Sequence, residues 1–173
     1  AAIAVCRQAE IPFDAIRKGL TTFKGIKRRQ EVRGEVNGIL VIDDFAHHPT
    51  AVEVTLEALR KVYAGHRIVA VFEPRTNTSR RSYFQQRYAL SFKSADRVLI
   101  APVHDLSGIE PQNRFDPGRL ADELTRQSIP AKSFDDLDAL LGNLLETCTS
   151  GDVVVMMSNG GFGGIHQKLL DAL

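Results

Sequence analysis

Apolar and polar residues follow two patterns along most of the chain. Short, nearly unbroken apolar runs, typical of buried strands, occur at residues 67–72, 97–103 and 152–158, with a weaker one at 131–134. Between them, apolar residues recur every three or four positions, as on one face of a helix, at 49–63, 82–92, 117–127, 136–148 and 164–173. Strands that are apolar on both faces and alternate with helices predict a parallel sheet with helices on both sides.

The start of the chain shows a different pattern. Residues 1–9 and 12–23 predict two short helices. The strand-like segments that follow flank Asn37-Gly38, a dipeptide that strongly favours a tight turn between antiparallel strands. For residues 24–173 we therefore expect a doubly wound α/β domain with a mostly parallel sheet and an N-terminal β-hairpin.

The composition is that of an ordinary globular domain, with 173 residues, 43% of them hydrophobic and 25% charged. The net charge of +1 gives no reason to expect nucleic acid or an anionic membrane as a partner. No apolar run is long enough to span a bilayer. Cys6 and Cys148 lie far apart and outside the spacings of disulfide or zinc motifs, which favours a reducing, cytoplasmic location.

Chemically rich side chains gather where the expected strands end. Segments 43–49, 73–78, 102–105 and 158–164 each follow an apolar run. In a doubly wound sheet, ligands bind beyond the carboxyl ends of the strands. We therefore expect these segments to lie on one edge of the sheet and to form one site.

The segment DDFAHHPT, at residues 43–50, has several interpretations. Carboxylates and imidazoles are common ligands of transition metals, so a metal site is one of them. However, neighbouring side chains of a strand point to opposite faces and Pro49 favours a helix start, so one acid and one histidine at most would share a face. A structural turn and contact with a nucleotide are the alternatives, and we favour the nucleotide, because a strand-end carboxylate can accept ribose hydroxyls.

Glycines and arginines on the same edge suggest contacts with anions. Residues 158–164 lie between a strand and a helix, where glycines let backbone amides approach a ligand, but they match neither the P-loop nor the dinucleotide-binding pattern. Arg75 lies where a substrate carboxylate could bind, and the pair Arg28-Arg29 could contact phosphates. No serine or cysteine stands in the setting of a nucleophile, so no catalytic residue is predicted.

Residues 23–60 resemble the start of the C-terminal domain of the Mur ligases, which has a Rossmann-like fold. In that family an F-x-G-x-x-R-R stretch, here residues 23–29, precedes a hairpin, and a D-[DS]-[YF]-[AG]-H-x-P segment, here residues 43–49, follows it. Residues 72–78 and 157–166 are similar to those of members that join the recycled murein tripeptide L-alanyl-γ-D-glutamyl-meso-diaminopimelate to UDP-N-acetylmuramate. The resemblance implies an ATP-dependent ligase of peptidoglycan recycling, in which the muramoyl carboxylate becomes an acyl phosphate that the peptide amine attacks.

The resemblance also implies roles for single residues. Arg29 would contact the nucleotide phosphates, Asp44 would bind the ribose hydroxyls and His47 would lie against the nucleotide, whereas Asp43 and His48 receive no role. The residues expected to face the incoming peptide are Arg75, Asn77, His104, Ser158, Asn159, Gly160 and Gly161.

Parts of the ligase site are not found in these residues. The family keeps its P-loop and magnesium site in a central domain and its UDP-sugar site in an N-terminal domain, so residues 1–23 would be the last helices of the central domain and the chain alone would be inactive. Alternatives are the UDP-N-acetylmuramate:L-alanine ligases and folylpolyglutamate synthase, whose C-terminal domain carries a similar segment. A nucleotide-sensing α/β module is the non-enzymatic alternative.

Overall fold

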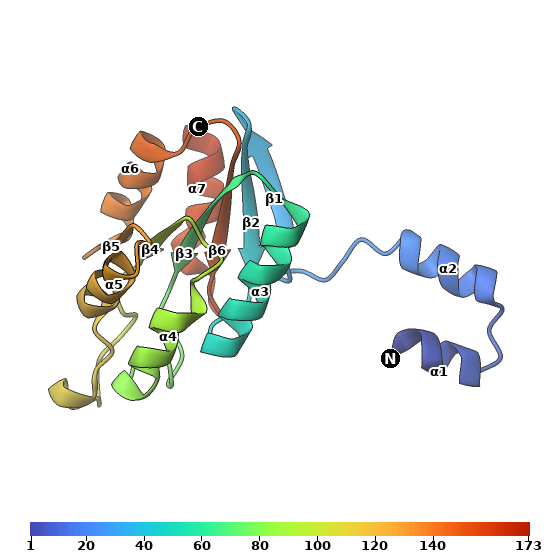
Figure 1. Ribbon diagram of the computed structural model, residues 1–173, viewed down its shortest axis with the longest axis horizontal. Helices are drawn as coiled ribbons and strands as arrows, with labels where there is room; N and C mark the ends of the chain where they lie inside the picture. The colour runs from blue at the N-terminus through green and yellow to red at the C-terminus, as the bar shows by residue number, and fades with distance from the viewer.

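The computed structural model describes all 173 residues and contains one six-stranded sheet (Figure 1). Its strand order is β1-β2-β6-β3-β4-β5, and β1 is the only antiparallel strand. This confirms the mostly parallel sheet. The strands are β1 (Glu31–Val36), β2 (Ile39–Asp44), β3 (Arg67–Phe72), β4 (Arg97–Ile100), β5 (Ala131–Ser133) and β6 (Asp152–Met157).

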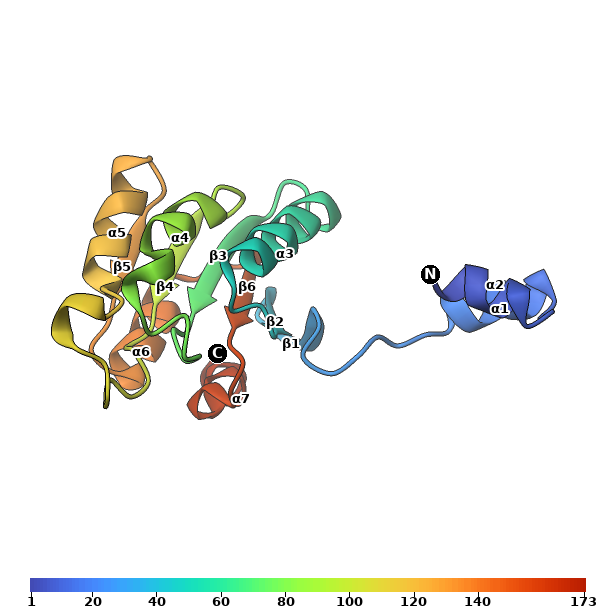
Figure 2. The same cartoon turned by 90° about the horizontal axis from the view of Figure 1, so that it is seen from below.

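Helices cover both faces of the sheet, as the apolar runs predict (Figures 1 and 2). One face packs against α3 (Pro49–Val62), α4 (Gln85–Ser91) and α5 (Pro117–Arg126). The other face packs against α6 (Leu137–Thr147) and α7 (Ile165–Ala172). Every residue of β6 is buried, because this central strand has a hydrophobic core on each side.

The N-terminal hairpin forms at the predicted dipeptide. Asn37 has φ +52° and Gly38 has φ +76°, so both turn residues adopt the left-handed conformation that a type I′ turn requires. Val36 pairs with Ile39 across this turn. The hairpin prediction is therefore confirmed.

Some element boundaries differ from those expected. β4 ends at Ile100 rather than at residue 103, and Pro102, which has no backbone N–H to donate, lies just beyond it. The segment 82–92 begins with a 3-10 turn, Ser82–Phe84, before α4 starts. A second short turn, Pro111–Asn113, lies within the loop that follows β4.

Two helices precede the sheet, α1 (Ala2–Gln8) and α2 (Phe13–Thr21). Both lie well to one side of the sheet and connect to it through an extended segment (Figures 1 and 2). Their apolar side chains are largely exposed, including those of Val5 and Phe13. The assignment of residues 1–23 to a preceding ATPase domain stays a prediction. None of the helices has the length and apolar character needed to cross a membrane.

The ends of β2, β6 and β3 lie side by side and are fixed to one another. The amide of Ser158 donates to the carbonyl of Asp44 at 3.1 Å, and the amide of Glu73 donates to the carbonyl of Met157 at 3.0 Å. The chain leaves β2 and β3 towards the face covered by α3 and α4, but leaves β6 towards α7. The end of β6 is thus the topological switch point, where doubly wound folds bind ligands.

Candidate functional site

Two of the three residues predicted to bind the nucleotide, Arg29 and His47, lie against one aromatic ring. The guanidinium carbon of Arg29 is 5.0 Å from the centre of the Phe45 ring, and the His47 ring packs edge-on against the same ring at 5.2 Å. Arg29 is exposed, so its charge is available to an anion. The backbone carbonyl of His47 accepts a hydrogen bond from Tyr88, a fully buried residue, which fixes the turn after β2.

Asp44 is buried at the end of β2 and is part of the local fold. Its Oδ1 accepts hydrogen bonds from the amide of Ala46 at 2.7 Å and from the hydroxyl of Thr55 at 3.3 Å. Its Oδ2 accepts only from the amide of Gln30, at 2.9 Å. Because each carboxylate oxygen can accept about two hydrogen bonds, Oδ2 has one acceptor position without a partner, and its contact with a ribose hydroxyl stays a prediction.

The neighbouring acid, Asp43, points to the opposite face of the sheet, as strand geometry predicts. Its Oδ1 lies 3.4 Å from Nε2 of His166 on α7, whereas Asp44 contacts Thr55 on α3. His48 is the N-cap residue of α3, and its ring nitrogen Nδ1 accepts a hydrogen bond from the amide of Thr50. These contacts give Asp43 and His48 a structural part in the fold.

On the other side of β6, a buried carboxylate organises residues predicted to face the peptide. Glu73 is only 5% exposed, and its Oε1 lies 3.4 Å from Nη1 of Arg75. Its Oε2 accepts a hydrogen bond from the Ser158 hydroxyl. The same hydroxyl accepts a hydrogen bond from the amide of Gly160 at 2.8 Å. The structure therefore brings Arg75, Ser158 and Gly160 together around Glu73.

Arg75 lies directly on the backbone of Gly160. A Cβ atom at this glycine would be 2.2 Å from Nε of Arg75, so only glycine permits the contact. His104 is also close, with Nδ1 at 3.4 Å from Nη1 of Arg75. Asn77 and Gly161 are exposed and have no side-chain hydrogen bond to this group, and the buried Oδ1 of Asn159 has no partner.

Sequence reasoning gave no role to Glu73 and considered Arg28 only as a phosphate contact beside Arg29. The Arg28 guanidinium lies over the Phe45 ring, 5.3 Å from its centre, and donates to backbone carbonyls of the loop after β6. Glu73 directly precedes Pro74-Arg75 at a strand end, so its position at the edge of the sheet could be predicted from the sequence. Its partner Ser158 is 85 positions away, and no local pattern indicates that pairing.

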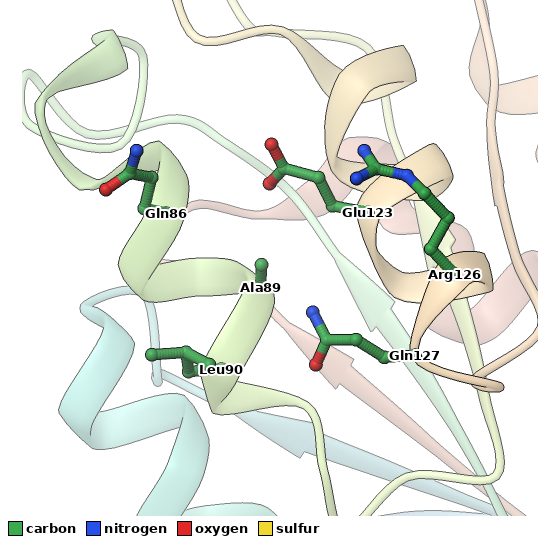
Figure 3. A pocket seen from close by; sticks show the side chains of 6 residues that line it. All are labelled: Gln86, Ala89, Leu90, Glu123, Arg126 and Gln127. Carbon is green, nitrogen blue, oxygen red and sulfur yellow. The ribbon is translucent and has the colours of Figure 1, made fainter.

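Of two surface hollows, one is lined by a predicted site residue and the other is not. One, of about 480 Å³, is lined by the segment 24–32 and includes Arg29, which places open space next to the predicted phosphate contact. The other, of about 330 Å³, lies between α4 and α5 (Figure 3). No residue predicted to bind a ligand lines the second hollow, so we do not assign it to the site. Its lining residues are Gln86, Ala89, Leu90, Glu123, Arg126 and Gln127.

No group of three or more histidine, cysteine, aspartate or glutamate side chains is arranged to bind a metal ion. Asp43 and Asp44 illustrate why, since they lie on opposite faces of the sheet. Cys148 is half-buried, and burial raises the pKa of its thiol to about 11, so this thiol stays protonated and unreactive near neutral pH.

The fold is that of a doubly wound α/β domain, and the candidate site lies at the switch point of its sheet. A family model described as the Mur ligase, glutamate ligase domain, matches residues 28–160. The chain belongs to the Mur ligase family.

Several ligases of this family are similar to the chain in sequence or structure. The UDP-N-acetylmuramate–L-alanyl-gamma-D-glutamyl-meso-2,6-diaminoheptandioate ligase of Escherichia coli K12 is 44% identical over 99% of this chain and 36% of its own length. The UDP-N-acetylmuramate–L-alanine ligase of Salinibacter ruber is 40% identical over 100% of this chain and 36% of its own length. The crystal structure of a murein peptide ligase from Psychrobacter arcticus matches with a TM-score of 0.73 and 39% identity, over 90% of this chain and 32% of that one. The chain thus spans about a third of each relative.

Proposed function

We propose that this chain is the nucleotide- and peptide-contacting domain of an ATP-dependent ligase. The enzyme would join L-alanyl-γ-D-glutamyl-meso-diaminopimelate to UDP-N-acetylmuramate in peptidoglycan recycling, in the cytoplasm. The observation that carries the proposal is the arrangement at the end of β6, where the Arg29–Phe45–His47 group lies on one side and the Glu73–Arg75–Gly160 group on the other. The Escherichia coli K12 ligase, which is 44% identical to this chain, supports this choice of substrates.

In this proposal the reaction has two steps. The muramoyl carboxylate attacks the γ-phosphate of ATP and releases ADP, which leaves an acyl phosphate. The amine of the peptide then attacks the acyl carbon, phosphate leaves, and an amide forms. Arg29 would stabilise negative charge on the phosphates, and Arg75 would bind a peptide carboxylate with its planar guanidinium.

Other parts of the reaction would depend on residues outside this chain. Phosphoryl transfer requires a magnesium ion and a phosphate-binding loop. The chain has no suitable cluster of metal ligands, so we propose that the ion, like the UDP-sugar, is bound by the two further domains of the longer protein. The domain alone would then bind nucleotide without catalysing ligation.

The test is ATP-dependent ligation by the full-length protein. The purified enzyme is given UDP-N-acetylmuramate and either the tripeptide or L-alanine. A separate assay for folylpolyglutamate synthase activity supplies folate and glutamate instead. We expect turnover with the tripeptide, whereas preference for L-alanine would favour the second candidate, which the Salinibacter ruber relative supports.

The nucleotide assignment is tested by Arg29→Ala. Because Arg29 is exposed and its guanidinium lies over the Phe45 ring without an ion pair, its loss should raise the KM for ATP about tenfold with little effect on folding. Arg87→Ala, which removes an exposed arginine from α4, is the matched control and should leave this KM unchanged. Equal ATP affinity in both variants would show the nucleotide assignment to be wrong.

A further inference from the structure

The side chain of Arg28 joins the start of the hairpin to the loop after β6. Its Nη2 donates to the carbonyl of Ser158 at 2.6 Å and also to the carbonyl of Gly160. Its Nη1 lies 3.5 Å from the carbonyl of Asn159, and its Nε lies 3.6 Å from Oδ2 of the buried Asp43. One guanidinium therefore contacts three consecutive carbonyls and a carboxylate.

The backbone separates Arg28 from its neighbour Arg29. Arg28 has φ +58° and Gln30 has φ +49°, so the chain turns sharply at this point. The carbonyl of Arg28 accepts a hydrogen bond from the amide of Phe45 at 2.9 Å, which anchors the turn beside Asp44 whatever the side chain is. Both guanidinium carbons lie over the Phe45 ring, that of Arg29 at 5.0 Å and that of Arg28 at 5.3 Å from its centre. Arg29 is exposed, whereas Arg28 is half-buried and donates to the loop.

We propose that Arg28 is a positioning residue for ligation, which holds the Ser158–Gly160 loop against the nucleotide-binding hairpin. The inference rests on the proposed function and adds a residue to it. Arg75 lies on Gly160, so a shift of this loop would also move Arg75. Arg28 thus fixes the place of the peptide-binding group relative to the nucleotide-binding group.

The geometry requires arginine at this position. A guanidinium presents five donors in a rigid fork, whereas a lysine ammonium is a single point that cannot reach three carbonyls and Asp43 together. Arg33 provides a matched comparison, because its Nη1 lies 3.5 Å from the same Oδ2 of Asp43 but it makes no hydrogen bond to the loop. The two arginines therefore share the ion pair with Asp43, and they differ in the loop contacts and in the contact of Arg28 with the Phe45 ring.

The experiment compares Arg28→Met, Arg28→Lys and the control Arg33→Met in the full-length enzyme. Steady-state kinetics give the KM for the tripeptide and for ATP separately, and hydrogen exchange gives the protection of the amides at 159–161. For Arg28→Met we expect the tripeptide KM to rise about tenfold or more, since hydrogen bonds from a charged group are lost. The ATP KM should change by less than about threefold, because the backbone anchor to Phe45 remains and Arg29 still lies over that ring when the Arg28 guanidinium is removed from it.

Exchange of the loop amides should be faster in Arg28→Met, partly restored in Arg28→Lys and unchanged in Arg33→Met. A parallel rise of both KM values, or faster loop exchange in Arg33→Met as well, would overturn the proposal, since either result would make Arg28 an ordinary stabilising residue. If the wild-type enzyme fails to ligate, the proposed function is wrong. The exchange data still decide whether Arg28 holds the loop.

Discussion

The two sides of β6 hold their site residues in different ways. On the β2 side, the Asp44 carboxylate is fixed by partners no more than 14 positions away in the sequence, which lie just before the hairpin, in the turn after β2 and on α3. On the β3 side, Arg75 is held by Glu73, and Glu73 contacts Ser158, which is 85 positions away. The first side is therefore part of the local fold, whereas the second is assembled by tertiary contacts.

This difference predicts which property each side loses on mutation. A residue of the β2 side that satisfies backbone amides supports the stability of the domain as well as its ligand. A residue of the β3 side mainly sets the geometry of exposed or half-buried groups. Variants on the two sides should therefore separate stability from peptide binding.

Asp44→Ala should have the largest effect, and that effect should be on stability. The change leaves the amides of Gln30 and Ala46 and the hydroxyl of Thr55 without their acceptor in a buried place. We expect a loss of about 3 kcal/mol or more in the free energy of unfolding. Urea denaturation of the 173-residue chain measures it.

The control for Asp44→Ala is Asp122→Ala, which removes an exposed acid from α5 and should change stability by less than about 0.5 kcal/mol. Equal and small losses in the two variants would contradict the view that Asp44 supports the local fold. Asp44 would then serve the ligand alone.

The sequence predicted the β2 side better than the β3 side, and the reason is the range of the contacts. The Asn37-Gly38 turn, the strand that ends at Asp44 and the helix that begins at Pro49 follow from neighbouring residues, so their positions could be predicted. The contact of Arg28 with Ser158 spans 130 positions, and no periodic pattern encodes it. The sequence therefore predicted which segments lie at the carboxyl ends of the strands. It did not predict which side chains of these segments contact one another.

Gly160→Ala tests the β3 side directly. The new Cβ would lie 2.2 Å from Nε of Arg75, so Arg75 or the loop must move. We expect kcat/KM for the tripeptide to fall roughly tenfold to a hundredfold, because small misplacements of positioning groups are costly, with the KM for ATP unchanged. Steady-state kinetics of the full-length enzyme with each substrate varied in turn measure both quantities.

The adjacent glycine provides the control. Gly161 has φ −72°, and a Cβ there would meet nothing within 4 Å, so Gly161→Ala should keep the wild-type values. A loss of ATP affinity in Gly160→Ala would show that the two sides of β6 are not separate. Wild-type peptide kinetics in Gly160→Ala would show that Arg75 does not contact the peptide.

Asp43 differs from Asp44 in being held by charges. Burial alone would raise the pKa of Asp43, but contact with His166 and the nearby charges of Arg28 and Arg33 outweigh burial, so the pKa lies below its ordinary value of 3.8. A carboxyl group with a lowered pKa in the folded chain stabilises the fold above its ordinary pKa. That stabilisation is lost as the pH falls through the folded pKa.

Asp43→Asn should therefore have the smallest effect, and one that depends on pH. At neutral pH we expect the variant to be about 1 kcal/mol less stable than the wild type, because the ion pairs with Arg28 and Arg33 are gone. Between about pH 5 and about pH 3 the difference should shrink, since the protonated Asp43 of the wild type carries no charge either. Urea midpoints across this range, with Asp122→Asn as the exposed control, measure the difference. A stability difference that stays constant across this pH range would mean that Asp43 acts through shape and neutral hydrogen bonds, as Asp44 acts through backbone amides. The contrast between the two neighbouring acids would then disappear.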